Sequence, residues 1–395
     1  MSIQHIVLFD GNQRNHLLPL TATRAVADLR IGILTIKEKW EKYFNLKVDV
    51  LTQDYLQPKY SFQQTENTIF INANYLPTQS FVNDIKNLQK NQTLKHRTEL
   101  IAFRSNQPIT SLKNIEELEK SNQYGDKQIN TIESTYILSN PWNIFSWNGQ
   151  EIKNDIQLLG LKPNPEKLSK TNTILGNEIY VGENVSCECS VLNAKNGPIY
   201  LANDSEIMEG CTIRGTFALG EHATLKMQTK IYGDTTIGKY SKVGGEVSNS
   251  VIFGYSNKGH DGFLGNSVIG EWCNLGADTN NSNLKNNYGK VSAWSYPEKK
   301  YISTNLQFCG LIMGDHAKAA INTQFNTGTV VGVCANVIDA GFPQKFVPDF
   351  SWGNSAVFEL EKAYEVAQRV MERRQINLSE IDKNILKYIF ENRIK

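Results

Sequence analysis

The sequence lacks the features that mark membrane, secreted and nucleic-acid-binding proteins. It contains no run of about 18 apolar residues, the length that a transmembrane helix needs. Its first residues, MSIQHIVLFDGNQRN, lack the charged-then-apolar pattern of a signal peptide. The net charge is only +1, so neither a nucleic-acid footprint nor a polybasic membrane anchor is indicated. These absences predict a cytoplasmic protein that binds neither membranes nor nucleic acids.

Cysteine is also scarce, and its spacing carries no motif. None of the 6 cysteines belongs to a Cys-x-x-Cys pair, which disfavours a structural zinc site and a thioredoxin-like redox site. Without a secretion signal, free thiols in a reducing compartment are expected. The chain has 395 residues, which is long for one core and suits two domains.

The second half of the sequence carries an internal repeat with a period of six. Eight positions spaced by six are all aliphatic, which is improbable in a chain that is 40% hydrophobic: Leu201, Ile207, Ile213, Leu219, Leu225, Ile231, Ile237 and Val243. A period of six is neither helical nor a simple strand alternation. It predicts a solenoid whose flat sides each point one aliphatic side chain inward.

The repeat continues beyond position 243 with interruptions. It slips by two residues, resumes at Val251, fails at Asn257, and returns at Phe263, Ile269 and Leu275. A later run keeps the same period: Ala319, Phe325, Val331 and Val337. The slips predict loops near 245–262 and 280–306 that leave the coil.

Repeats such as IGKYSK, VIGEWCN and VVGVCAN resemble the hexapeptide pattern of left-handed parallel β-helix acyltransferases. The resemblance covers roughly residues 172–345. It implies a left-handed β-helix, and it implies a homotrimer with active sites in the clefts between neighbouring prisms. The spacing alone does not give the handedness, since β-crossovers are normally right-handed.

One segment resembles a more specific family. GHDGFLGNSVIGEWCNLGADTNNSNLK is similar to a segment of the bifunctional N-acetylglucosamine-1-phosphate uridylyltransferase/glucosamine-1-phosphate acetyltransferases. The resemblance implies that His260 is the general base for the sugar amine, and that Phe263 and Asn274 contact substrate. An imidazole suits this role because its pKa lies near neutrality. Phe263 replaces a tyrosine of the family and lacks its hydroxyl.

The same resemblance implies a set of basic and amide contacts for the sugar phosphate and for coenzyme A. Lys230 falls where a phosphate-binding residue is expected on an earlier coil. The Asn283-Leu284-Lys285 sequence resembles the archaeal form of the family. Lys285, Lys290 and Lys318 are then candidate phosphate contacts, and each is also compatible with an ordinary solvated surface charge.

Residues 1–165 show no such repeat and predict an α/β sheet domain. Short apolar strands at 6–9, 48–52, 68–71 and 100–103 alternate with helical patterns at 33–43 and 115–121. The DGNQRN loop after the first strand is a candidate phosphate cradle. Followed by Pro19-Leu20-Thr21, it resembles the sugar-nucleotidyltransferase signature.

The signature implies nucleotide-binding roles for Gly11 and Arg14. The lysine of the signature falls on Ala25-Val26 and is absent, so Arg24 and Arg30 are the candidates to supply its charge. The resemblance also implies Mg²⁺ as cofactor. Asn74 aligns with the family's metal-binding aspartate, and Asp155 is the candidate second ligand.

The chain is therefore expected to comprise a nucleotidyltransferase-like α/β domain (1–165), a left-handed β-helix acyltransferase domain (172–352) and C-terminal helices (355–395). The helices are expected to cap the open end of the solenoid or to pack on a neighbour.

The function that the resemblance implies is acetyl transfer from acetyl-CoA to glucosamine 1-phosphate and uridylyl transfer from UTP to the acetylated sugar 1-phosphate, giving UDP-N-acetylglucosamine. Two alternatives stay open. One is a hexose-1-phosphate nucleotidyltransferase, such as a thymidylyltransferase, with a purely structural β-helix. The other is a non-catalytic regulatory or scaffold protein.

Overall fold

The structure is a computed structural model that describes residues 5–65, 68–96, 99–105, 108–121, 125–128 and 137–394. The chain divides into two compact units. The first comprises residues 1–17, 23–29 and 34–140, and the second comprises 18–22, 30–33 and 141–395. The sequence-predicted boundary at residue 165 falls inside the second unit. No helix in the described ranges is both long enough and apolar enough to cross a bilayer.

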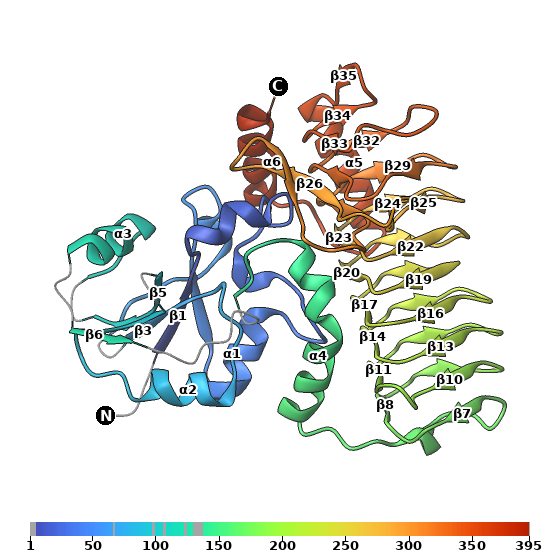
Figure 1. Ribbon diagram of the computed structural model, residues 1–395, viewed down its shortest axis with the longest axis horizontal. Coiled ribbons are helices and arrows are strands. Elements are labelled where there is room, and N and C mark those ends of the chain that lie inside the picture. The colour runs from blue at the N-terminus through green and yellow to red at the C-terminus, as the bar shows by residue number, and fades with distance from the viewer. Residues whose placement is uncertain are drawn as a thin grey trace. The chain divides into compact units, whose positions relative to one another are not determined.

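The first unit is built on a mixed sheet of six strands in the order β2-β1-β3-β5-β4-β6 (Figure 1). Strands β1, β2 and β3 are mutually parallel, whereas β5 runs antiparallel to β3 and β4. The strand bounds are β1 His5–Phe9, β2 Val48–Leu51, β3 Thr68–Asn72, β4 Gln92–His96, β5 Glu99–Arg104 and β6 Gly125–Gln128.

In the described part of this unit the sheet is accompanied by the α-helices α1 Ile36–Phe44, α2 Gln79–Lys86 and α3 Leu112–Ser121 and by the short 3-10 helices η1 Asn12–Leu17, η2 Val26–Asp28 and η3 Gln57–Lys59. The sequence pattern places the first helix at 33–43, three residues too early. Thr35 explains the difference, because its hydroxyl accepts the N–H of Glu38 while the Glu38 side chain accepts the N–H of Thr35. This reciprocal cap starts the helix at Ile36.

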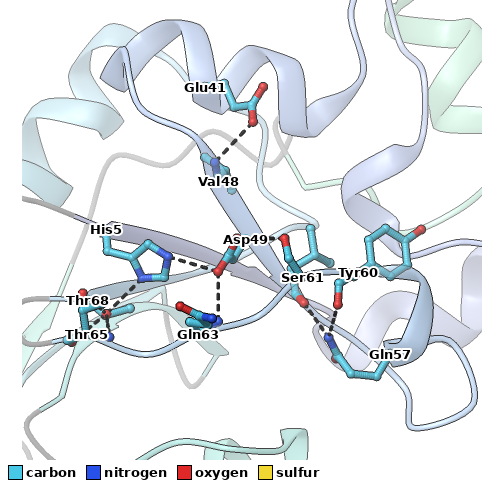
Figure 2. Close-up of polar contacts among 11 residues, drawn as sticks. His5, Glu41, Val48, Asp49, Gln57, Tyr60, Ser61, Gln63, Thr65 and Thr68 are labelled. Atoms are coloured by element: carbon cyan, nitrogen blue, oxygen red, sulfur yellow. Dashed lines mark hydrogen bonds and ion pairs between the residues drawn. The ribbon is translucent and has the colours of Figure 1, made fainter.

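The parallel strands are joined by a polar network around His5 and Asp49 (Figure 2). The His5 ring lies 3.2 Å from the Thr68 hydroxyl and 3.1 Å from the Asp49 carboxylate. Asp49 also accepts the Ser61 hydroxyl and the Gln63 N–H. The His5 side chain therefore bridges β2 and β3. These hydrogen bonds explain the presence of a histidine here without a catalytic role.

The second unit is a parallel β-solenoid with three faces, whose strands stack in successive coils (Figure 1). One face is a six-stranded sheet: β7 Thr173–Leu175, β10 Val191–Asn193, β13 Thr212–Arg214, β16 Lys230–Tyr232, β19 Glu246–Ser248 and β22 Phe263–Gly265.

The second face is a nine-stranded sheet: β8 Ile179–Val181, β11 Ile199–Leu201, β14 Phe217–Leu219, β17 Thr235–Ile237, β20 Val251–Gly254, β23 Val268–Glu271, β28 Ile312–Met313, β31 Val330–Val331 and β33 Phe346–Val347. The third face is a ten-stranded sheet: β9 Ser186–Cys187, β12 Glu206–Ile207, β15 Thr224–Leu225, β18 Lys242–Val243, β21 Asn257–Lys258, β24 Asn274–Leu275, β29 Lys318–Ala319, β32 Asn336–Val337, β34 Ser351–Trp352 and β35 Ala356–Val357.

The period-six prediction is confirmed for most of the solenoid. All eight aliphatic residues from Leu201 to Val243 belong to its hydrophobic core, as do the four from Ala319 to Val337. The prediction is wrong by one residue in the middle coils. Ile252 and Leu264 lie in the core instead of Val251 and Phe263, because Phe263 pairs with the outward-facing Glu246 and Leu264 with the core residue Val247. The combination of an α/β unit, a β-solenoid and a helical tail is confirmed, and the left hand of the solenoid stays a prediction.

A long insertion leaves the coil after the short strand β25 (Asn280–Asn281), which still pairs in parallel with β30 (Gln324–Phe325). The insertion contains the hairpin β26 (Ser292–Ser295) and β27 (Lys300–Ser303). The predicted loop at 280–306 thus begins with a strand of the coil and contains an antiparallel hairpin.

Three α-helices pack within this unit. Helix α4 (Trp142–Leu158) contacts strands β14, β17, β20 and β23, and a 3-10 turn η5 (Pro165–Lys167) follows it. Helices α5 (Leu360–Glu372) and α6 (Glu380–Asn392) form the tail. They lie along one edge of the solenoid, because Phe390 packs on Phe350 and Arg374 donates to the Tyr240 carbonyl, several coils earlier. The expected cap at the open end is therefore replaced by packing along the side.

Candidate functional site

The first candidate site is a hollow of about 210 Å³ at the carboxyl ends of β1 and β3. In open α/β sheets this edge is the usual ligand position. Its lining includes Gly11, Arg14, Asn72 and Glu99. Pockets for whole ligands usually measure about 300–1,000 Å³, so this hollow has room for part of a nucleotide.

Arg14 is held in this hollow by a buried carboxylate. Its Nε lies 3.1 Å from the Asp10 carboxylate, and its guanidinium donates to the Tyr55 hydroxyl at 2.8 Å and to Asn15 at 3.1 Å. Asp10 also accepts the N–H of Val26 and the Thr52 hydroxyl. Burial raises the pKa of Asp10, and the Arg14 charge opposes this effect. The pair therefore fixes a guanidinium at the start of the loop.

Gly11 is the residue that lets this loop approach β3. A Cβ at Gly11 would lie 2.4 Å from the side-chain amide atoms of Asn72. Asn72 ends β3, accepts the N–H of Asn74 and donates to the Leu100 carbonyl. The sequence interpretation did not name Asp10 or Asn72, although each stands where a predicted strand gives way to a turn, which was the available signal.

The other residues that the sequence predicted for nucleotide or metal binding do not line this hollow. Arg24 is buried and is not among the residues that line the hollow. Arg30 belongs to the second unit and donates to the Ile33 carbonyl. Asp155 also lies in the second unit, where its carboxylate accepts the N–H of Ile33 at 2.8 Å. Asp155, on α4, thus anchors the segment of residues 30–33 that carries Arg30.

The two predicted metal ligands do not provide a fit for Mg²⁺. The Asn74 amide donates to the Leu138 carbonyl, its Oδ1 is buried without a hydrogen-bond partner, and the residue has no exposed surface. The Asp155 carboxylate is 1% exposed and already binds the backbone. Within the described ranges, no group of three or more His, Cys, Asp or Glu side chains is arranged for a metal ion.

The second candidate site lies at one corner of the solenoid. His260 is exposed in the short loop that joins β21 on the ten-stranded face to β22 on the six-stranded face. The loop is packed between neighbouring coils. A Cβ at Gly245 would lie 3.0 Å from the His260 carbonyl oxygen, and a Cβ at Gly262 would lie 2.2 Å from the carbonyl oxygen of Thr279. The imidazole is thus presented to solvent on a closely packed backbone.

Two predicted substrate contacts lie beside this loop on the six-stranded face. The Phe263 ring and the Asn283 amide both approach the α-carbon of Gly265, and Asn283 donates to Asn266 at 2.8 Å. Lys230 lies two strands away from Phe263, with Glu246 paired in register between them. Glu246 accepts the Tyr232 hydroxyl at 2.5 Å.

Asn274 and Lys318 lie together on the ten-stranded face. They are register partners on β24 and β29, and Asn274 also pairs with Asn257 on the strand that leads to the His260 loop. The Lys318 ammonium donates to the His316 carbonyl at 2.8 Å. Burial lowers the pKa of Lys318. His316, which also lies in a loop between solenoid strands, is 8% exposed, in contrast to His260.

Lys285 and Lys290 lie in the insertion, where a pocket of about 480 Å³ opens. Lys285 lines it together with Asn287, Asn326 and Phe342. The Lys285 ammonium donates to the Lys290 carbonyl at 2.6 Å. Burial, and then the charge of Lys285, lower the pKa of the nearby Lys345. Such a pocket suits an anionic group next to an aromatic ring.

Comparison with known proteins decides the class of the first unit. Residues 6–162 match the sugar nucleotidyl transferase family. These residues form a nucleotidyltransferase-like α/β domain, and the matched range extends into α4 of the second unit.

Curated relatives combine two activities in their names. The bifunctional protein GlmU of Methanocaldococcus jannaschii is 32% identical over 113 residues, covering 29% of this chain and 26% of that protein. A bifunctional sugar-1-phosphate nucleotidylyltransferase/acetyltransferase of Sulfurisphaera tokodaii is 27% identical over 143 residues, covering 36% and 35%. The chain thus covers only 26% of the length of the first relative and 35% of the length of the second.

Solved structures resemble the chain more distantly. An Arabidopsis UDP-N-acetylglucosamine acyltransferase is 13% identical and covers 55% of this chain and 87% of its own, with a TM-score of 0.28. That score is too low to support an argument about this chain.

Proposed function

We propose that the protein is a bifunctional enzyme of amino-sugar nucleotide synthesis. Its solenoid transfers acetyl from acetyl-CoA to the amine of glucosamine 1-phosphate. Its first unit transfers uridylyl from UTP to the resulting N-acetylglucosamine 1-phosphate, giving UDP-N-acetylglucosamine and pyrophosphate. The observation that carries the proposal is the exposed His260, presented at a solenoid corner beside Phe263 in a chain with a sugar nucleotidyl transferase domain.

In the proposed acetyl transfer, the sugar amine attacks the thioester carbonyl carbon and forms the C–N bond. His260 acts as the general base and takes the proton that the amine loses. The tetrahedral intermediate then collapses, the C–S bond breaks, and the coenzyme A sulfur leaves and receives a proton. Phe263 supplies an apolar wall for the sugar. Asn274 and Asn283 are the proposed amide contacts.

The anionic groups of both substrates need positive partners on the solenoid. Lys230 is the proposed contact for the sugar phosphate. The pocket at Lys285 and Phe342 suits a phosphate of coenzyme A, with Lys290 nearby and Lys318 on the adjoining face. We further propose a homotrimer, as the hexapeptide resemblance implies. Light scattering should give three times the chain mass of 44.6 kDa.

In the proposed uridylyl transfer, the chain's contribution is positioning and charge neutralisation, which dominate phosphoryl and nucleotidyl chemistry. Gly11 lets the backbone come close to the nucleotide, and Arg14, oriented by Asp10, meets phosphate oxygens. Arg24 and Arg30 lie outside this hollow, so the proposal gives them no phosphate contact. A divalent cation, with Mg²⁺ expected from the resemblance, would enter with the triphosphate.

A coupled assay of the purified protein tests the proposal. Acetyl-CoA with glucosamine 1-phosphate should release free thiol, and UTP with N-acetylglucosamine 1-phosphate should release pyrophosphate. Pyrophosphate without thiol would favour a nucleotidyltransferase with a structural solenoid, with dTTP and hexose 1-phosphates as the next substrates to assay. Neither product, together with no nucleotide binding by calorimetry, would favour a regulatory or scaffold protein.

A further inference from the structure

A lysine occupies a core position of the solenoid directly before the His260 loop. Lys258 is the register partner of the core residue Val243, and the residue before it, Asn257, pairs with Asn274. Its place in the coil is therefore the one that Leu275 takes on the next strand. Lys258 is only 2% exposed, although a buried charge is costly unless it is hydrogen-bonded.

The Lys258 ammonium binds two corner carbonyls. It donates to the carbonyl oxygen of Gly244 at 3.0 Å and to that of His260 at 2.7 Å. The first carbonyl belongs to the preceding coil and the second to the His260 loop. One charge-assisted donor thus ties two successive corners together. Burial lowers the pKa of Lys258 to about 8, and Asp261 and Asp278 oppose that effect.

Three other coils stabilise the same corner differently. There a threonine, four residues after the core residue, donates its hydroxyl to the carbonyl of the first corner residue. The pairs are Thr229 to Lys226, Thr279 to Gly276 and Thr323 to Ala320, at 2.6 to 2.8 Å. In the His260 coil the corresponding residue is Gly262, which has no hydroxyl. In the preceding coil the corner is shortened to Gly244 and Gly245, and no threonine is present.

Neither of the two corners whose carbonyls Lys258 binds has a threonine at this position. The position of His260 in its coil is that of Met227, which is 65% exposed, and of Ile321, which is 68% exposed. The corner thus points its second residue outward in the coils of Met227, His260 and Ile321, and in the His260 coil the lysine binds the carbonyl of that second residue.

We propose that Lys258 is a positioning residue for His260: its ammonium holds the His260 carbonyl and thereby fixes where the imidazole stands at the solenoid corner. This inference rests on the proposed acetyl transfer. Lys258 does not touch substrate in this role, and it acts through the backbone of the loop. Misplacement of a general base by about 1 Å can cost about 10²-fold in rate.

The test replaces Lys258 by methionine, which fills the same core space without donor or charge. Lys258→Met should keep the wild-type melting temperature or exceed it, because removing a buried charge offsets the two lost hydrogen bonds. Amide hydrogen exchange over residues 259–262 should become faster. The kcat of acetyl transfer should fall about 10–10²-fold with KM values unchanged. Lys242→Met, which removes an exposed lysine from the preceding strand, is the matched control and should match wild type in both measurements.

Wild-type exchange in the loop, or a wild-type kcat in a variant with faster exchange, would overturn the inference. If the methionine variant does not fold, Lys258→Gln, which retains one donor group, takes its place under the same criteria. The wild-type protein and His260→Ala are assayed in parallel. Lack of thiol release by the wild-type protein would overturn the proposed acetyl transfer. Unchanged hydrogen exchange in the Lys258 variant would overturn only the positioning role of Lys258.

Discussion

The α-carbon of Gly262 lies so close to the next coil that a Cβ there would come within 2.2 Å of the Thr279 carbonyl oxygen. Gly262 also has a φ of +112°, a conformation that side chains other than glycine rarely adopt. At the other end of the same loop, a Cβ at Gly259 would meet nothing within 4 Å. The His260 loop is therefore tightly seated at one end and open at the other.

This asymmetry predicts opposite outcomes for two similar substitutions. Gly262→Ala should push the loop away from Thr279 and lower the kcat of acetyl transfer by at least about 10-fold, since small displacements of a catalytic group are costly. Gly259→Ala should stay within about twofold of wild type because open space surrounds its α-carbon. Steady-state thiol release measures both. Equal activities in the two variants would show that the seating of the loop does not matter.

Removal of the imidazole tests the proposed base directly. His260→Ala should lower acetyl transfer by about 10²–10⁴-fold, the usual contribution of a general base. Uridylyl transfer should not change, because the pocket at Gly11 and Arg14 lies in the other unit. His222→Ala removes an exposed histidine from the same solenoid and is the matched control. Unchanged thiol release by His260→Ala would remove the assignment.

The hexad pattern predicted the solenoid because every coil repeats the same requirement for an aliphatic side chain inside. It failed at Val251 and Phe263, where shortened corners shift the register by one residue. The failure at Asn257 was informative: the inward residue is Lys258, a charge that no aliphatic pattern identifies. Its role depends on carbonyls of two different coils, and only the folded backbone brings these together.

The nucleotidyltransferase-like α/β domain was less predictable. The strands followed from their apolar runs, but helix α4 was missed, since its buried residues include Asn148, Glu151 and Asp155. Asn148 and Asp155 accept the N–H groups of residues 32 and 33, Glu151 accepts from the Asn154 amide, and the three do not form an apolar stripe. The pocket residue Asn72 was likewise missed in favour of Asn74, two positions on, because spacing does not tell which amide faces Gly11.

The contact between Gly11 and Asn72 predicts a selective loss of the second activity. Gly11→Ala would place a methyl group 2.4 Å from the Asn72 amide, so the loop must move away from the end of β3. Uridylyl transfer, measured as pyrophosphate release, should fall at least about 10-fold while acetyl transfer is unchanged.

The matched control adds the methyl group at position 11 and also removes the Asn72 amide with which it would clash. In the double variant Gly11→Ala/Asn72→Ala the clash is absent, so activity should recover to the level of Asn72→Ala alone. A double variant that is no more active than Gly11→Ala would mean that the methyl group obstructs the nucleotide itself, and the close approach to β3 would then not explain the loss.

Asp349 gives a prediction on the pH dependence of stability. Its buried carboxylate accepts the N–H of Val333 at 2.6 Å, and burial raises its pKa from 3.8 to about 6. Between these two values the folded state keeps a proton that the unfolded chain has lost. The free energy of unfolding therefore falls as the pH rises through this window, and the loss is complete above about pH 6.

Elsewhere in the solenoid, an asparagine side chain accepts the corresponding backbone N–H. Asn203 accepts the N–H of Glu183 at 2.8 Å in the equivalent arrangement beside Gly182. Asp349→Asn should keep the bond to Val333 without burying a charge, and should raise the free energy of unfolding at pH 8 by about 1–3 kcal/mol. At about pH 4, where the wild-type carboxyl is protonated, the gain should vanish. Denaturant unfolding at the two pH values measures the difference, with the exposed Asp204→Asn as control. An equal gain at both pH values would mean that the asparagine stabilises through packing and that the buried charge of Asp349 is not the cause.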